Sequence, residues 1–427
     1  MNISRNSKSK KSPYLIIFMF FQLIVMSGNV RYFLTDNFQL FNMFLTIVIS
    51  LVYNRFHINP RIFIIIGVFV LISIPPSILY GIDIRLYFGW AIRIVNAYFF
   101  VRIYREQLWE YLLSVVQTLA LISLPFYFIQ ITYPSFFDIF NPISNFLLND
   151  SQRGHQYLIV FLLNKYDRAP GTRNSGFMWE PSAFAAVLVW TLLVRLIKDN
   201  FKFTPWTYVL LIAFITTFST GGYIGLIILL SASILHIKTN KVKYFGLIAL
   251  LLFLYVWDLR TGIVSENFQT SVLKIEDEPI HIYNATTGKA NKGEISRVAG
   301  YVLGFQSILH SPIGYGFPKN ESEFGLLGYS PNAFMNLFIR WGIIGITFII
   351  ISMIMSVKFL LFHYNIKVSR IVQYLCILAL IMSFNGTTLD KQIIAISILL
   401  YYWMLRPKIY KENTNSIQYP QIIITND

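Results

Sequence analysis

Charged side chains are scarce in this chain. Only 13% of its 427 residues are charged, whereas 55% are hydrophobic; soluble domains carry about 25% charged residues. The apolar residues gather in runs close to the roughly 20 residues that cross a bilayer as a helix. This balance excludes a water-soluble globular enzyme and predicts an all-α, polytopic membrane protein.

Cysteine and recognisable cofactor motifs are also lacking. The single cysteine, Cys376, lies in an apolar run, so an intrachain disulfide is excluded and outer loops must be held by packing. The sequence has no Walker A loop and no Rossmann glycine pattern, and its histidines show no metal-ligand spacing. We therefore expect no metal, no cofactor and no ATP-driven machine.

Acidic residues are few relative to basic ones. The 35 Lys and Arg residues outnumber the 20 Asp and Glu residues, for a net charge of +15. A nucleic-acid-binding protein could have this balance, but here the basic residues form short clusters between apolar runs instead of one tract. The distribution argues against a nucleic-acid partner and for a membrane.

About twelve apolar segments are candidate spans. The first follows the basic residues Arg5 to Lys11 and has no small-residue cleavage site after it, so we interpret it as an uncleaved helix. The fourth is the weakest because it contains Arg93 and Asn96. The segments are centred near 14–30, 38–54, 61–80, 86–104, 109–130, 181–197, 206–219, 222–237, 243–258, 333–357, 370–385 and 391–405.

The distribution of basic residues sets the expected orientation. With the N-terminus in the cytoplasm, 20 of the 35 Lys and Arg residues fall on the inner side. Short loops follow such a bias, whereas long loops are largely exempt from it. Both termini are therefore expected on the cytoplasmic side, with two long outer loops at 131–180 and 259–332 in a single transmembrane domain, 1–427.

The two long outer loops carry the polar candidates, because long loops inside compact folds are commonly functional. In the first loop, the apolar patch from Tyr157 to Leu163 is too short to span and is interpreted as interfacial. In the second, apolar residues from Val298 to Leu309 recur at helical spacing. This pattern predicts an amphipathic helix on the membrane surface with Arg297 near its start. No inverted repeat with broken helices is evident.

Three polar residues of the first loop point to anion chemistry. Arg168 and Arg173 flank the turn signal Pro170-Gly171, and guanidinium groups suit phosphate because they present a planar fork of donors. Glu180 precedes Pro181 and could take a proton from a sugar hydroxyl. The alternatives stay open: the arginines could be solvated loop cations, and Glu180 could simply cap the following helix.

The later segment adds a second set. Arg297 coincides with the amphipathic helix, and Gly314 and Gly316 could bring backbone amides close to a ligand or form an ordinary turn. Arg340 lies about seven residues inside an expected span, where an arginine costs roughly 2.5–3.5 kcal/mol to insert. Such residues usually face the interior of the bundle or a cavity, although snorkelling to the interface is the alternative.

Together these segments resemble the O-antigen polymerase and ligase superfamily of bacterial envelope glycosyltransferases. The local matches, each loose alone but more specific in this order, are Arg173-Asn174-Ser175-Gly176-Phe177 with Glu180-Pro181, Ser219-Thr220-Gly221-Gly222, Ser296-Arg297 with Gly314-x-Gly316, and Ser330-Pro331-Asn332 with Gly342-x-x-Gly345. Ligases of this superfamily have a His-Asn pair where this chain has Pro331-Asn332. The departure favours a polymerase and removes an obvious general base.

The resemblance implies a metal-independent enzyme of GT-C-like fold in the bacterial inner membrane. It would move a growing glycan, for lipopolysaccharide O-antigen or capsule, from undecaprenyl pyrophosphate onto a new lipid-linked repeat unit. A chain-length regulator and a flippase would be partners. Glu180 and Arg297 would be catalytic, and Arg168, Arg173, Arg340, Gly314, Gly316 and Asn332 would hold the pyrophosphate. An O-antigen ligase, a lipid-linked oligosaccharide flippase and a membrane receptor are the alternatives.

Overall fold

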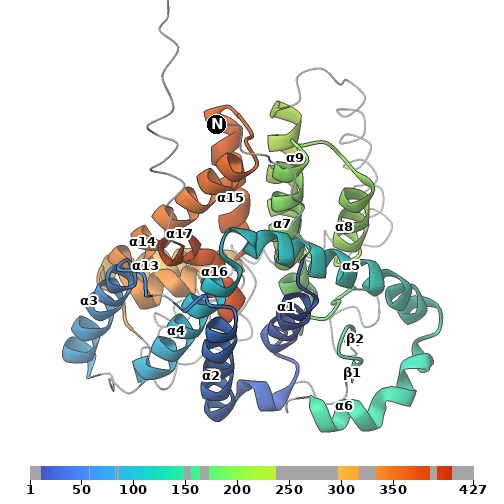
Figure 1. Cartoon of the computed structure of the whole chain (residues 1–427), viewed down its shortest axis with the longest axis horizontal. Coiled ribbons are helices and arrows are strands. Elements are labelled where there is room, and N and C mark those ends of the chain that lie inside the picture. Colours follow the sequence, from blue (N-terminus) through green and yellow to red (C-terminus); the bar gives the residue numbers. More distant parts are fainter. Residues whose placement is uncertain are drawn as a thin grey trace, which may run out of the picture.

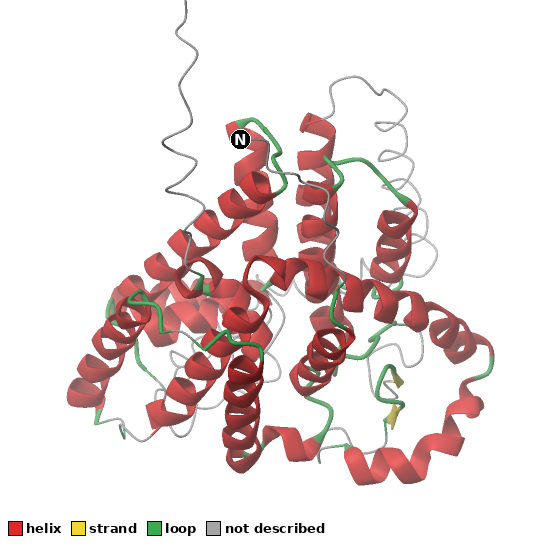
Figure 2. Cartoon of the chain, viewed as in Figure 1, coloured by secondary structure: helices red, strands yellow, loops and turns green. Residues whose placement is uncertain are grey.

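The structure, a computed structural model, describes residues 11–56, 58–81, 83, 86–148, 155–163, 173–236, 297–316, 333–384 and 392–405. This part of the chain is almost entirely helical, with one two-stranded antiparallel sheet (Figure 2). The expectation of a mainly α-helical protein is confirmed.

The first half of the described chain holds the elements up to the start of α7 (Figure 1). They are α1 (Pro13–Met26), η1 (Arg31–Leu34), α2 (Asp36–Val52), α3 (Ile62–Tyr80), α4 (Leu86–Tyr104), η2 (Arg105–Gln107), α5 (Leu108–Thr132), η3 (Pro134–Phe140), α6 (Asn141–Leu147), β1 (Gln156–Tyr157) and β2 (Leu162–Leu163). The second half holds α7 (Pro181–Lys198), α8 (Pro205–Ile215), α9 (Thr220–His236), α13 (Arg297–His310), α14 (Ala333–His363), α15 (Arg370–Ser383), α16 (Ile393–Leu399) and α17 (Tyr401–Met404).

Four helical stretches in the described residues are long and apolar enough to cross a membrane. They are Ile62–Tyr80, Tyr87–Thr132, Pro181–Lys198 and Phe334–His363, and five further apolar helices are shorter. The predicted span at 391–405 contains two short helices, α16 and α17, which meet at Leu400. The predicted span at 243–258 lies outside the described residues.

Helix α2 has the pattern of polar and apolar side chains that suits a helix facing lipid. Its buried residues are the polar Asn42, Thr46 and Ser50, while Phe41 and Phe44 on the outside are 58% and 59% exposed. Asn42 exchanges two amide hydrogen bonds with Gln22 of α1, at 2.7 and 3.1 Å. Lipid tails are as apolar as these outer side chains, so small and polar residues hold the helix–helix contacts instead.

Hydrogen bonds show which helix ends lie on the same side of the bundle. The beginnings of α1 and α5 meet the ends of α7 and α14, because the Glu110 carboxylate accepts hydrogen bonds from Lys198 and Tyr364, both at 2.7 Å. We call this side the Glu110 end. The end of α5 meets the segment before α7, where Gln130 donates to the backbone carbonyl of Arg173 at 3.1 Å. We call the opposite side the Arg173 end.

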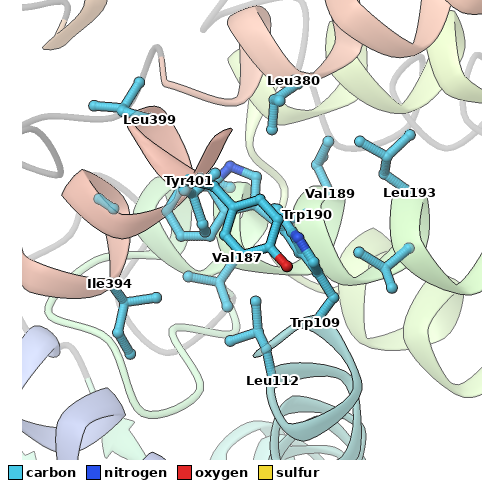
Figure 3. Close-up of a cluster of buried hydrophobic side chains, with 14 of the residues drawn as sticks. Trp109, Leu112, Val187, Val189, Trp190, Leu193, Leu380, Ile394, Leu399 and Tyr401 are labelled. Carbon is cyan, nitrogen blue, oxygen red and sulfur yellow. The ribbon is translucent and has the colours of Figure 1, made fainter. Parts of the chain in front are cut away.

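A continuous apolar core joins the two ends. Trp109 of α5 packs edge-on against Tyr401 of α17 at a centroid distance of 5.5 Å, with side chains from α7, α15 and α16 around them (Figure 3). Trp190 of α7 donates to Ser383 Oγ at 2.5 Å and packs on Phe384 at the end of α15. This core fixes α7, whose first residue follows Glu180.

Much of the apolar patch of the first long loop is buried within the protein, whereas Ile159 is 46% exposed. Strands β1 and β2 form a small hairpin with Tyr157 and Phe161 fully buried. Phe161 stacks against Phe126 of α5 and Phe137 of η3, at centroid distances of 5.6 and 5.7 Å. Aromatic side chains of α5 and η3 thus cover Phe161.

Candidate functional site

Three of the predicted site residues have limited or no description in the structure. Arg168 and Asn332 lie outside the described residues. Arg297 is the first residue of α13, as the sequence predicted, although the position of its side chain is not described. The other five, Arg173, Glu180, Gly314, Gly316 and Arg340, fall into two clusters.

The first cluster surrounds Arg173, between the ends of α5 and α8. The Arg173 Nε donates to the backbone carbonyl of Thr217 at 3.2 Å, and the Arg173 carbonyl accepts from Gln130. Arg173 also lies close enough to Tyr223 of α9 to interact with it electrostatically. Three helices therefore set where this guanidinium lies.

Asn174 anchors the same segment through its side chain. The side chain is fully buried and its Nδ2 donates to Ser123 and Thr216, at 3.2 and 2.9 Å. Its Oδ1 accepts from the amide of Gly176 at 2.8 Å, which closes an Asx turn. The Arg173-Asn174-Ser175-Gly176 motif is thus a built turn that holds Arg173 against the bundle.

Gly176 requires the freedom of glycine. Its φ is 52°, and a Cβ there would lie 2.6 Å from the ring of Phe184 on α7. The Gly176 carbonyl also accepts from the amide of Leu162 at 2.7 Å, which links the turn to the β1–β2 hairpin. A larger residue would push the turn away from α7.

Glu180 is the N-cap residue of α7 and has an extended backbone, with φ −151° and ψ 155°. Pro181 follows at the first helical position, where its missing N–H costs nothing. The Glu180 side chain makes no capping hydrogen bond to the first helical amides. No hydrogen bond therefore supports the interpretation of Glu180 as a helix cap. The carboxylate is partly exposed, and it sits at the positive end of the α7 dipole.

The second cluster forms where α14 is broken. Gly342 has φ 59° and ψ −166° within α14, which interrupts the helical hydrogen bonds. The loop after α13 takes over the released groups: the amides of Tyr315 and Gly316 donate to the carbonyls of Ile339 and Arg340, at 2.8 and 3.1 Å. In return, the Ile343 amide donates to the Pro312 carbonyl at 2.8 Å. Inside a membrane such pairing is required, because an unpaired backbone group costs several kcal/mol.

This pairing gives Gly314 and Gly316 a role that the sequence did not predict. A Cβ on Gly314 would lie 2.6 Å from both the Arg340 carbonyl oxygen and the Gly342 amide nitrogen. The Gly314 amide itself donates to the Ser311 carbonyl at 2.9 Å. The amides of both glycines are therefore engaged within the protein, and we reassign these residues from contact with a ligand to holding the break.

Arg340 lies about two turns after the start of α14, two residues before the break at Gly342. Its side chain is only 7% exposed, which agrees with a residue facing the bundle more than with one snorkelling to water. Its neighbour Trp341 packs edge-on against Trp90 of α4 at 5.7 Å, and Arg93 lies over the Trp90 ring. The aromatic pair brings α4, which carries Arg93, beside the Arg340 segment.

Tyr80 and Tyr315 close this cluster from the side of α3. Their rings stack at a centroid distance of 5.3 Å, and the Tyr80 hydroxyl donates to Ser311 Oγ at 2.9 Å. Burial, and next the neighbouring Tyr80, raise the pKa of Tyr315. The Tyr315 hydroxyl therefore stays protonated at neutral pH and can act as a hydrogen-bond donor.

Helix α13 packs against the first segment of α14 through its small residues. Gly304 receives the Met335 side chain, and Ser307 is fully buried. Phe305 and Leu309 are 58% and 83% exposed, although Phe305 also contacts the ring of Phe338. The helix predicted from the sequence at this position is present.

Sequence reasoning missed the network at the Glu110 end. Glu110 binds Lys198 and Tyr364, and the Lys11 ammonium donates to its backbone carbonyl at 2.9 Å. Burial lowers the pKa of Lys11, partly offset by the Glu110 charge. Arg195 pairs with Asp199 at 2.6 Å nearby. The signal in the sequence was a lone glutamate at the start of an apolar span, which is costly unless it is paired.

No cluster of three or more metal-ligating side chains occurs within the described ranges. Comparison of the sequence with models of known protein families and with curated proteins found no match in either case. The functional argument therefore rests on the residues and their geometry.

Proposed function

We propose that the protein is a polysaccharide polymerase of the bacterial inner membrane. It transfers a growing glycan from undecaprenyl pyrophosphate to a new lipid-linked repeat unit at the outer face. The single observation that carries the proposal is the Arg173 turn, which is fixed to α5 and α8 and leads within seven residues to Glu180 at the start of α7.

The chemistry needs charge stabilisation more than covalent catalysis. The acceptor hydroxyl oxygen attacks the anomeric carbon, the bond from that carbon to the pyrophosphate oxygen breaks, and undecaprenyl pyrophosphate leaves with the electron pair. Arg168, Arg173 and Arg297 stabilise the charge that develops on the leaving group. Glu180 takes the proton of the attacking hydroxyl, and Arg340 lines the interior beneath them.

The number of spans and their orientation in the membrane are part of the same proposal. Twelve spans with both termini in the cytoplasm place the Arg173 end outside, where lipid-linked repeat units are polymerised. The alternation of helix ends at Glu110 and Arg173 supports this arrangement, since it follows the order expected from the basic loops. The GT-C-like architecture, the chain-length regulator and the flippase as partners are part of the proposal.

A lipid-linked oligosaccharide flippase is the second candidate, and the break in α14 favours it. Discontinuous helices are common at the substrate sites of transporters, and Gly342 creates one here. Loss of a flippase removes even single repeat units from the cell surface, whereas loss of a polymerase leaves them. The ligase alternative would need another histidine, such as His310, to replace in space the one that is missing at Pro331.

The decisive experiment replaces Arg297 with Ala in a strain that makes the polymer. We expect single repeat units on the surface glycan and loss of the polymer ladder, measured by gel electrophoresis of the extracted glycan at matched protein level. A normal ladder would count against the assignment, and absence of single units would favour the flippase. Polymerisation of purified repeat units, with and without chelator, tests the enzyme directly and its independence of metal.

A further inference from the structure

A segment at the Arg173 end carries an apolar surface that the proposed catalytic site does not use. It consists of η3 and α6, two helices of seven residues each, which follow the end of α5 at the edge of the molecule (Figure 1). We call these residues, 134–147, the η3–α6 arm. The only charged residue of the arm is Asp138, whereas soluble domains carry about 25% charged residues.

The inner side of the arm is fixed to the β1–β2 hairpin, which lies between α6 and α5 (Figure 1). The Tyr157 amide donates to Ser144 Oγ at 2.7 Å. The Gln156 Nε2 donates to Asp138 Oδ1 at 2.5 Å and to Asn141 Oδ1 at 3.1 Å. The one charged group of the arm is therefore engaged by a hydrogen bond within the protein.

The outer side of the arm is apolar. Ile139, Ile143 and Phe146 are 65%, 53% and 64% exposed, and their spacing of four and three residues is that of side chains on one side of a helix. In α6 the buried residue is the polar Ser144. A helix between a protein core and water has the opposite arrangement, with its apolar residues turned to the core.

The apolar surface of the arm continues that of α5. Leu121, Phe128 and Ile131 of α5 are 46%, 58% and 51% exposed, at a spacing that places them on one side of the helix. This helix belongs to a stretch, Tyr87–Thr132, that is long and apolar enough to cross a membrane. The exposed stripe of α5 leads through Tyr133, which is 63% exposed, directly into the arm.

An aromatic ring and a cation lie beside the end of the arm. The Tyr32 ring of η1 contacts the Phe146 ring at a centroid distance of 5.9 Å, and the Arg31 guanidinium lies over Tyr32 at 4.7 Å. Tyrosines are enriched where a membrane meets water, and guanidinium groups suit the phosphates of lipid headgroups. An apolar face bordered in this way fits a lipid surface.

We propose that the η3–α6 arm lies in the bilayer interface at the Arg173 end, with Ile139, Ile143 and Phe146 among the acyl chains. Arg31 meets the headgroups. Interfacial helices lie about 5–10 Å into the boundary between headgroups and acyl chains, so the contact is shallow. The proposal rests on a membrane location and not on polymerase activity, so either proposal can fail without the other.

The interfacial contact also bears on the Arg173 turn. The hairpin that the arm holds is joined to this turn, because the Leu162 amide donates to the Gly176 carbonyl at 2.7 Å. An arm anchored in the interface therefore keeps the Arg173 turn close to the membrane surface.

The test uses one fluorescent label on the full-length protein. The only cysteine, Cys376, is fully buried, and Cys376→Ala removes it from the background. Ile143→Cys then gives a label on the apolar side of α6. Asn145→Cys is the matched control, because Asn145 is also exposed on α6 but residues two apart do not share a side of a helix.

The labelled proteins are reconstituted into vesicles of phosphatidylethanolamine and phosphatidylglycerol. The label is quenched either by lipid that carries a nitroxide or by iodide in the water. The ratio of lipid quenching to iodide quenching should be several-fold higher at Ile143 than at Asn145. A nitroxide near the headgroup should quench the Ile143 label more than one at the end of the acyl chain, because the contact is shallow.

Two results would overturn the proposal. The same ratio at Ile143 and Asn145 would show that the arm has no side that faces lipid. Weak quenching of the Ile143 label by both quenchers would show that protein covers this face, such as a second copy of the chain. If Ile143→Cys fails to fold, Phe146→Cys repeats the measurement from the same side of the arm.

Discussion

The two ends of the bundle hold their cations in different ways. At the Glu110 end, Lys198 and Arg195 are bound by carboxylates, at 2.7 and 2.6 Å. At the Arg173 end, the Arg173 guanidinium donates to a backbone carbonyl, and glycine turns fix the chain around it. A cation paired with a carboxylate within the protein serves stability, whereas a guanidinium held in place by a turn beside α8 is fixed in position, which the proposed recognition of an anionic substrate requires.

The largest expected effect comes from replacing one arginine at each end of the bundle with glutamine and comparing the two variants. Arg173→Gln should lower the polymerisation rate per folded molecule about 100-fold or more, the usual loss when one donor to developing negative charge is removed. Arg195→Gln should leave that rate unchanged and lower stability by about 2 kcal/mol, because its ion pair with Asp199 is mostly buried, with side chains 15% and 16% exposed. Initial rates with purified repeat units and thermal unfolding in detergent measure both. Equal polymerisation rates for Arg173→Gln and Arg195→Gln would show that the arginines at the two ends do not differ in function.

Gly342→Ala tests whether the Arg173 end depends on backbone geometry. A Cβ at Gly342, with φ 59°, would lie 2.5 Å from the Pro312 carbonyl oxygen, so we expect a loss of roughly 3 kcal/mol. Polymerisation should also fail because the Arg340 segment moves. Gly67→Ala is the control: nothing lies within 4 Å of its Cβ position, and a helical alanine should stabilise by about 0.5–1 kcal/mol. A fully stable, active Gly342→Ala protein would show that the break is dispensable.

A smaller effect than that of Gly342→Ala is expected at Glu110. Glu110→Gln removes the charge that binds Lys198 and leaves the Tyr364 hydrogen bond without its strong acceptor. We expect a loss of about 2 kcal/mol, less than the 3–5 kcal/mol of a fully buried pair, because the Glu110 side chain is 19% exposed. Thermal unfolding measures it, and Glu106→Gln, one turn earlier, is the matched comparison. A double-mutant cycle with Lys198→Met should recover most of the loss as coupling energy.

Prediction from the sequence succeeded where a local pattern decides the structure. The start of α13 at Arg297 followed from helical spacing of apolar residues, and the burial of Arg340 followed from the cost of an arginine within a span. The roles of Gly314 and Gly316 did not follow, because their partners, Arg340 and Gly342 of α14, lie more than 20 residues later and meet them only in three dimensions. The packing of the hairpin at Tyr157 could not be predicted for the same reason, since Phe161 packs against Phe137 of η3.

By itself the sequence predicted a helical membrane protein, and the predicted spans that lie within the described residues are helical. Few charges and long apolar runs are sufficient for this, because lipid offers no partner to an unpaired backbone group. Only the tertiary structure decided which polar groups meet: Glu110 with Lys198 and Tyr364, Arg173 with Thr217, and the loop after α13 with the break in α14. These contacts join residues far apart in the chain, and packing of the helices brings them together.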